Sequence, residues 1–283
     1  MANREGGAMK ILYVTDLDGT LLNTRDRISE YSKRVINELI KAGMHFTYAT
    51  ARSLNSASVV TEGLNHQIPV IVYNGAFILD ATTREVITSS GFSTEEKQFI
   101  KELLHNYQVS PLVYAFIEGI ERVSWIQKYE NEGIRYYLNN RKGDKRFRKV
   151  EQAEALYEGE VFYFTCIGER EELLPIYEVL KNHPSYNCVF QKELYREEYW
   201  CEIMPKKATK ANAIKQLKKL FQYDRVIAFG DAVNDIPMFE TADECYAVAN
   251  AVPELKKIAT DIIASNEEDG VAKWLLEEIT SNL

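Results

Sequence analysis

The stretch KILYVTDLDGTLL, residues 10–22, decides the fold of this chain. Its apolar part, Ile11–Val14, is rich in β-favouring residues and predicts a buried strand. Two carboxylates, Asp16 and Asp18, follow directly, and Gly19 allows a sharp turn after them. In an open parallel α/β sheet, ligands bind beyond the carboxyl ends of the strands, so we expect these acids to face a crevice. A hard cation such as Mg²⁺ would relieve the repulsion between them, and one carboxylate could then attack an electrophile.

Polar residues also follow three later apolar stretches that read as strands. These residues are Thr50 after His45–Ala49, Asn74 and Gly75 after Pro69–Tyr73, and Asp231 to Asp235 after Arg225–Phe229. Lys210 begins an amphipathic helix just before the last of these strands. Because parallel strands end at a shared edge of the sheet, we expect the groups to meet. Metal-assisted phosphoryl transfer needs a nucleophile, carboxylates for the cation, an acid–base group and donors for the phosphoryl oxygens, and this set supplies each of them.

Taken singly, most of these residues have a simpler structural explanation. Two aspartates in a turn, or a threonine that ends a strand, are common turn residues. A lysine that opens a helix is usually solvated. The segment Gly230–Asp235 is more specific, because several carboxylate and amide side chains directly after a fully apolar strand would not suit a packed core. In this order along the chain, the groups together predict a catalytic site.

The order of the predicted elements indicates two domains. Strands alternate with helices near both ends of the chain, which is typical of right-handed βαβ units and a parallel sheet. Between them the pattern changes to hairpins, aromatic strands and helices, with a basic, irregular stretch at 139–149 that we expect to be a loop. We therefore predict an α/β core formed by residues 1–82 and 205–283, interrupted by an inserted α+β domain at 83–204.

In this order the motifs resemble those of the haloacid dehalogenase superfamily of aspartate-nucleophile phosphotransferases. Within it the chain is similar to the Cof-type, sugar-phosphatase-like members, which carry a large C2-type cap between the second and third motifs. The similarity rests on Asp16–Thr20, Ala49–Arg52, Tyr73–Ala76, Thr209–Lys210, Gly230–Met238 and Ser265–Ala272. The resemblance implies a Rossmann-like parallel-sheet core with an inserted α+β cap domain. The chain departs from the family pattern at Ala51, where glycine is usual, and at Lys207, which adds positive charge near the core–cap junction.

The resemblance also implies a role for each site residue. Asp16 would attack phosphorus to form an aspartyl-phosphate, while Asp18 would protonate the leaving alcohol and later deprotonate the hydrolytic water. Mg²⁺ would be bound by Asp16, Asp231 and the backbone carbonyl of Asp18, with Asp235 as a ligand or beside the ligands. Contacts with the phosphate or the rest of the substrate would come from Thr50, Arg52, Asn74, Gly75, Lys210 and Asn234.

The function implied by the resemblance is that of a phosphoric monoester hydrolase. It would be a Mg²⁺-dependent phosphatase of small phosphorylated metabolites, sugar phosphates foremost, in which Thr50 and Lys210 act in catalysis by holding the transferring phosphoryl group. A phosphomutase-type phosphotransferase is an alternative, because capped relatives with the same motifs include such enzymes. A non-catalytic phospho-accepting switch is a third reading, although the acid–base group Asp18 and the long cap argue against it.

Composition and charge limit the partners and the compartment. The 283 residues carry a net charge of −8, which argues against nucleic acid as a partner. No run approaches the about 20 apolar residues of a membrane span, and the four cysteines lack metal-binding or redox spacing, so we expect no membrane association and a cytoplasmic location. Residues 1–8 are expected to be a disordered leader, and the protein to be a monomer or a homodimer.

Overall fold

The computed structural model describes residues 9–192 and 196–281, so the expected leader at 1–8 lies outside the described residues. The chain forms two compact units. The first comprises the described residues up to Ser89 and from Thr209 onward, and the second comprises Ser90–Ala208. Both boundaries lie C-terminal to those expected from the sequence, and the first does so because the hairpin that ends at Ser89 pairs with a strand of the first unit.

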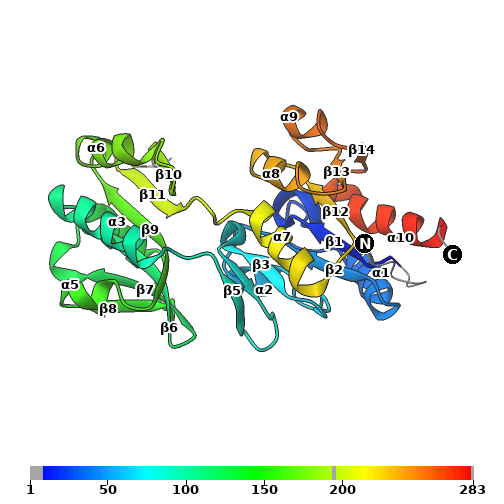
Figure 1. Cartoon of the computed structure of the whole chain (residues 1–283), viewed down its shortest axis with the longest axis horizontal. Helices are drawn as coiled ribbons and strands as arrows, with labels where there is room; N and C mark the ends of the chain where they lie inside the picture. Colours follow the sequence, from blue (N-terminus) through cyan, green and yellow to red (C-terminus); the bar gives the residue numbers. More distant parts are fainter. Residues whose placement is uncertain (1–8, 193–195, 282–283) are drawn as a thin grey trace, which may run out of the picture. The chain divides into compact units, whose positions relative to one another are not determined.

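The first unit is built on a five-stranded parallel sheet (Figure 1). Its order is β14 (Asp261–Ile263), β13 (Glu244–Val248), β12 (Arg225–Gly230), β1 (Ile11–Thr15) and β2 (His45–Tyr48). The strand β1 therefore lies between β12 and β2, with Leu12 and Val14 buried on one face of the sheet and Tyr13 buried on the other. Burial of both faces explains the continuous apolar run after residue 10. The expected parallel α/β core is confirmed.

Helices precede or follow the strands of this sheet along the chain. They are α1 (Glu30–Lys41), α2 (Leu54–Val60), α7 (Lys210–Phe221), α8 (Ile236–Phe239), α9 (Pro253–Lys256) and α10 (Gly270–Ser281). The helix α1 packs against α10, and α7 packs against α8 (Figure 1). Thr209 caps α7, because its side-chain oxygen accepts a hydrogen bond from the backbone N–H of Asn212 at 3.1 Å. This cap fixes the start of α7 and with it the position of Lys210, the first residue of the helix.

The strand expected near Pro69–Tyr73 does not extend the parallel sheet. It forms a separate three-stranded antiparallel sheet, in the order β3 (Val70–Val72), β4 (Phe77–Leu79) and β5 (Val86–Ser89). The chain turns back after β3 because residues 73–75 all have a positive φ, between 50° and 98°. The prediction of a further parallel strand holds only for a single parallel bridge, while the ladder of β3 is antiparallel. A parallel bridge between Ala49 and Ile71 still brings the loop after β3 beside the loop after β2.

The second unit contains a six-stranded sheet. Its order is β10 (Tyr186–Lys192), β11 (Tyr199–Pro205), β9 (Glu160–Gly168), β6 (Leu112–Ile117), β7 (Ile120–Ile126) and β8 (Phe147–Val150). The described helices of this unit are α3 (Thr94–Asn106), α4 (Glu132–Asn139), α5 (Ala153–Leu156) and α6 (Arg170–Leu180). A core that includes Ile100, Val113 and Phe164 joins α3 to the sheet. The expectation of a loop at 139–149 is wrong at its end, because Phe147 begins β8 and pairs in parallel with β7.

Candidate active site

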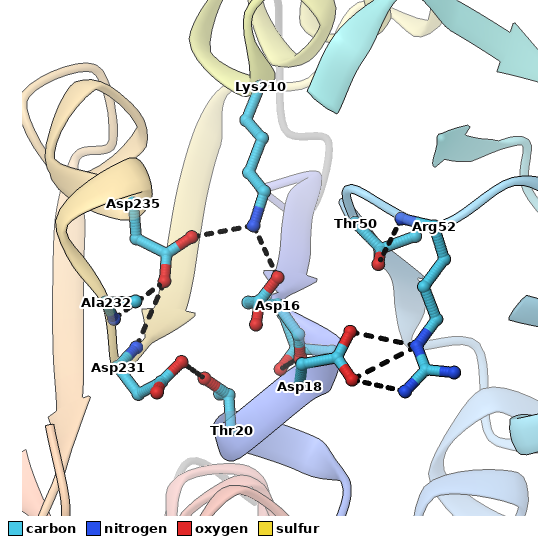
Figure 2. A network of polar contacts seen from close by, with 10 residues as sticks. Asp16, Asp18, Thr20, Thr50, Arg52, Lys210, Asp231, Ala232 and Asp235 are labelled. Carbon is cyan, nitrogen blue, oxygen red and sulfur yellow. Dashed lines mark hydrogen bonds and ion pairs between the residues drawn. The ribbon is translucent and has the colours of Figure 1, made fainter. Parts of the chain in front are cut away.

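A buried lysine joins two of the predicted motifs at the carboxyl edge of the parallel sheet. Lys210 Nζ donates a hydrogen bond to Asp16 Oδ1, just beyond β1, and a second one to Asp235 Oδ1, beyond β12, at 2.7 Å (Figure 2). Lys210, Asp16 and Asp235 are only 2%, 5% and 0% exposed. Burial lowers the pKa of Lys210, but the two carboxylates outweigh it and raise that pKa above its usual value. The lysine is therefore held in its charged form.

The loop after β12 folds around the carboxylate of Asp235. Asp235 Oδ2 accepts hydrogen bonds from the backbone N–H groups of Asp231 and Ala232, both at 3.1 Å (Figure 2). Asp231 Oδ1 in turn accepts a hydrogen bond from Thr20 Oγ1 at 2.9 Å, which ties this loop to the turn after β1. The turn comes so close at Gly19 that a Cβ there would lie 2.3 Å from Asp231 Oδ2. The glycine therefore leaves room for the Asp231 carboxylate.

Three carboxylates form a candidate metal site. Asp16, Asp231 and Asp235 each offer one oxygen, and these oxygens lie within 4.8 Å of one another. Burial raises the pKa of Asp16 to about 7, and the neighbouring carboxylates add to this effect although Lys210 opposes it. Burial also raises the pKa of Asp231. Because a divalent cation would supply the missing positive charge, and Mg²⁺ prefers oxygen ligands, these residues fit a magnesium site.

We expect Gly19→Ala to weaken Mg²⁺ binding by roughly 10- to 100-fold, because the added methyl group displaces the Asp231 carboxylate. Calorimetric titration with Mg²⁺ measures the effect. The matched control is Gly43→Ala, since Gly43 also has a positive φ, of 104°, but a Cβ there meets nothing within 4 Å. Equal Mg²⁺ affinities in the two variants would show that the contact with Asp231 does not matter for the metal.

Asp18, the second carboxylate of the opening motif, does not join this cluster. Its side chain points toward Arg52 (Figure 2). Arg52 Nε donates to Asp18 Oδ2 at 2.9 Å, and Arg52 Nη2 donates to Asp18 Oδ1. The Asp18 side chain is 48% exposed. Of the four aspartates expected at the metal, the structure thus brings three side chains together, and Asp18 keeps only its backbone carbonyl as an expected ligand.

The loops after β2 and β3 meet through backbone hydrogen bonds. The backbone N–H of Asn74 donates to the carbonyl oxygen of Thr50 at 2.8 Å, and Thr50 is fully buried. Asn74 Oδ1 is also buried and has no hydrogen-bond partner among the described residues. Such an acceptor is free to receive a donor from a ligand. Gly75 lies against the start of α7, where a Cβ would come 2.1 Å from the backbone oxygen of Thr209.

The substrate contacts expected from the sequence stay predictions, and sequence reasoning overlooked two residues that support the loops. Asn234 is exposed in the turn that precedes Asp235, and its expected contact with substrate stays a prediction. Asp26, which was not selected, accepts a hydrogen bond from the Arg52 side chain at 3.2 Å. Asn250, also not selected, donates from Nδ2 to the carbonyl oxygen of Gly19 at 2.7 Å. Asn250 carried a usable signal, because it is a polar residue shortly after β13.

The fold and the site together define a class of α/β enzymes that gather carboxylates and a buried lysine at the carboxyl edge of a parallel sheet. The chain belongs to the haloacid dehalogenase-like hydrolases, whose family model matches residues 13–275. The predicted superfamily and fold class are thereby confirmed.

Individual relatives match over almost the whole chain. A protein of Streptococcus pyogenes is 29% identical over 279 residues, which cover 94% of this chain and 98% of that protein. A Bacillus subtilis protein named 5-amino-6-(5-phospho-D-ribitylamino)uracil phosphatase is 26% identical over 279 residues, covering 92% of this chain and 95% of its own length. The crystal structure of a Thermotoga maritima protein is similar with a TM-score of 0.73 at 26% identity, covering 96% of this chain and 97% of its own.

The family of hydrolases, with a relative named phosphatase, confirms the predicted enzyme class, a phosphoric monoester hydrolase. None of the described helices combines the length and the apolar composition that crossing a bilayer requires.

Proposed function

We propose that this chain is a Mg²⁺-dependent phosphatase that hydrolyses small phosphorylated metabolites, sugar phosphates foremost, through an aspartyl-phosphate on Asp16. The observation that carries the proposal is the contact between Lys210 and Asp16 inside the cluster of three carboxylates. Buried alone, Asp16 would tend to protonate, whereas a lysine and a bound cation keep it ionised and able to attack. The Bacillus subtilis relative, named as the phosphatase of a phosphoribitylamino compound, supports a small phosphorylated metabolite as the substrate.

Two half-reactions would follow from this arrangement. In the first, Asp16 attacks phosphorus, an O–P bond to Asp16 forms, and the bond from phosphorus to the leaving oxygen breaks. Asp18 gives its proton to that oxygen, so the product leaves as an alcohol. In the second, water attacks phosphorus, the bond to Asp16 breaks, and Asp18 takes a proton from the water. Inorganic phosphate leaves, and Asp18 has regained the proton that it gave.

The remaining residues would bind and orient the phosphoryl group. Lys210 and the hydroxyl of Thr50 would hold the phosphoryl oxygens during transfer, and Asn74 would orient the bound phosphate or substrate. Mg²⁺, held by Asp16, Asp231 and the carbonyl of Asp18 with Asp235 beside it, would neutralise the negative charge on the phosphoryl oxygens.

Phosphate release from a panel of sugar phosphates, pyridoxal phosphate and nucleotides tests the proposal. We expect Mg²⁺-dependent release from a few related compounds, lost in EDTA and restored by added Mg²⁺. A folded, Mg²⁺-binding protein that releases phosphate from none of them would overturn the phosphatase proposal. A phosphomutase would instead convert a sugar phosphate to its isomer and require a bisphosphate primer, so nuclear magnetic resonance of the products separates the two activities.

A further inference from the structure

The side chain of Arg52 is directed at Asp18 (Figure 2). Its Nε lies 3.1 and 2.9 Å from the two carboxylate oxygens of Asp18, and its Nη2 donates to one of them. The same Nη2 donates to Asp26 Oδ1 at 3.2 Å, and Nη1 donates to Ser56 Oγ at 3.3 Å. Each nitrogen of the guanidinium thus has a partner within the protein. A substrate that binds at Nε or Nη2 would have to displace an ion pair in which both carboxylate oxygens of Asp18 take part.

The backbone of Arg52 is fixed on both sides. Its N–H donates to the hydroxyl oxygen of Thr50 at 3.1 Å, and its carbonyl oxygen accepts a hydrogen bond from the N–H of Tyr73 at 3.0 Å. The Arg52 side chain is 21% exposed, whereas those of Asp18 and Asp26 are 48% and 73% exposed. Among Asp18, Arg52 and Asp26, Arg52 is therefore the least exposed, and it lies in the loop that joins β2 to α2.

We propose that Arg52 is a positioning residue that holds the Asp18 carboxylate in place for proton transfer, with Asp26 supporting Arg52 from the other side. This inference rests on the proposed phosphatase function. An aspartate that is half exposed in a turn can adopt several rotamers, and proton transfer requires its oxygen within hydrogen-bonding distance of the leaving oxygen. A planar guanidinium that contacts both oxygens of the ionised carboxylate selects one orientation, which a lysine cannot do in the same way. When Asp18 carries the proton, one of its oxygens can still accept a hydrogen bond from Arg52 while the other presents the proton to the leaving oxygen. The expectation from the sequence that Arg52 contacts substrate stays a prediction, and inhibition by phosphate distinguishes it from a role exerted through Asp18.

The leaving group reveals whether Arg52 acts through Asp18. Departure of a basic alkoxide needs the proton of Asp18, whereas departure of an acidic phenol such as 4-nitrophenol hardly needs it. The ratio kcat/KM reports only steps up to leaving-group departure, so it isolates this proton transfer from the later attack of water. We expect Arg52→Lys and Arg52→Gln to lower kcat/KM for an alkyl phosphate by roughly 10- to 100-fold, and for 4-nitrophenyl phosphate by less than about 3-fold.

Three further variants calibrate the experiment. Asp18→Asn should show the same dependence on the leaving group with a larger loss, because the proton donor itself is gone. Asp26→Asn should show it with a smaller loss of roughly 2- to 5-fold, because the Asp18 ion pair remains. The matched control is Arg84→Gln, which removes an exposed arginine of the same unit that donates to Asn55 Oδ1 at 2.9 Å, and it should change neither substrate's rate.

The inhibition constant of inorganic phosphate completes the test. We expect it to be unchanged in Arg52→Lys, because in this proposal Arg52 does not contact the phosphoryl group. Equal losses on both substrates, or much weaker inhibition by phosphate, would overturn the positioning role and show that Arg52 binds the phosphate. If Arg52→Gln fails to fold by circular dichroism, Arg52→Lys gives the same comparison with the charge retained. A wild-type protein that hydrolyses neither substrate with Mg²⁺ would instead remove the phosphatase function, and the positioning role with it.

Discussion

Asp16→Asn is expected to lower Mg²⁺-dependent phosphate release by a factor on the order of 10⁴ or more, because the amide cannot form the covalent bond to phosphorus. The amide is close in size to the carboxylate, so the packing around this buried position is retained. Initial rates with the best substrate of the panel give the effect. The matched control is Asp224→Asn, since Asp224 precedes β12 at the other end of the sheet and its side chain accepts a hydrogen bond from the backbone N–H of Lys10. Substantial turnover by Asp16→Asn would mean that another residue is the nucleophile.

The same variant should be more stable than the wild type in EDTA, by a margin that grows with pH. Burial raises the pKa of Asp16 from 3.8 in its unperturbed form to about 7 in the folded protein. The folded state therefore retains a proton that the unfolded chain loses, and stability from this group is full below about pH 4 and is lost as the pH rises toward 7. Asparagine does not titrate, so the gap in thermal midpoint between variant and wild type should be larger at pH 8 than at pH 5. A gap independent of pH would show that the Asp16 charge is not destabilising.

Predictions from the sequence succeeded where a simple rule relates a residue pattern to its place in the sheet. The buried strand β1 could be predicted from its apolar run, and the meeting of Asp16 with Asp235 followed from the shared edge of parallel strands. Lys210 was placed correctly for the same reason, since it opens the helix that leads into β12. These predictions concern the course of the backbone, which the order and direction of the strands in the parallel sheet determine.

The failures concern features that no local pattern determines. The ion pair between Arg52 and Asp18 depends on the rotamers of two partly exposed side chains, which sequence spacing does not specify. The strand β3 turns back into β4 through three successive positive φ angles, and Tyr73, unlike Asn74 and Gly75, belongs to a residue type that rarely adopts one. The strand β8 arises in a basic segment whose pairing with β7 is set by the rest of the second unit. Tertiary contacts decided each of these cases.

Lys210→Met is expected to lower the free energy of unfolding by about 3 to 5 kcal/mol, because it leaves the buried carboxylates of Asp16 and Asp235 without their cation. The thermal midpoint in EDTA should fall by roughly 10 °C, and kcat/KM by roughly 10²- to 10³-fold with the loss of a phosphoryl contact. Lys218→Met on the same helix is the matched control, since the ion pair of Lys218 with Asp243 is about one-third exposed on each side and should change stability by less than about 1 kcal/mol.

A double variant separates the loss of the lysine charge from the loss of its packing. In the Asp16→Asn background, Lys210→Met leaves only Asp235 without its lysine, and Asp235 keeps two backbone N–H donors. The destabilisation by Lys210→Met should therefore be smaller there by roughly 1 kcal/mol or more. Added Mg²⁺ should also restore part of the lost thermal midpoint in Lys210→Met, because the cation can bind between the carboxylates that Lys210 no longer neutralises. Equal destabilisation in both backgrounds, with no recovery by Mg²⁺, would mean that Lys210 contributes through packing alone.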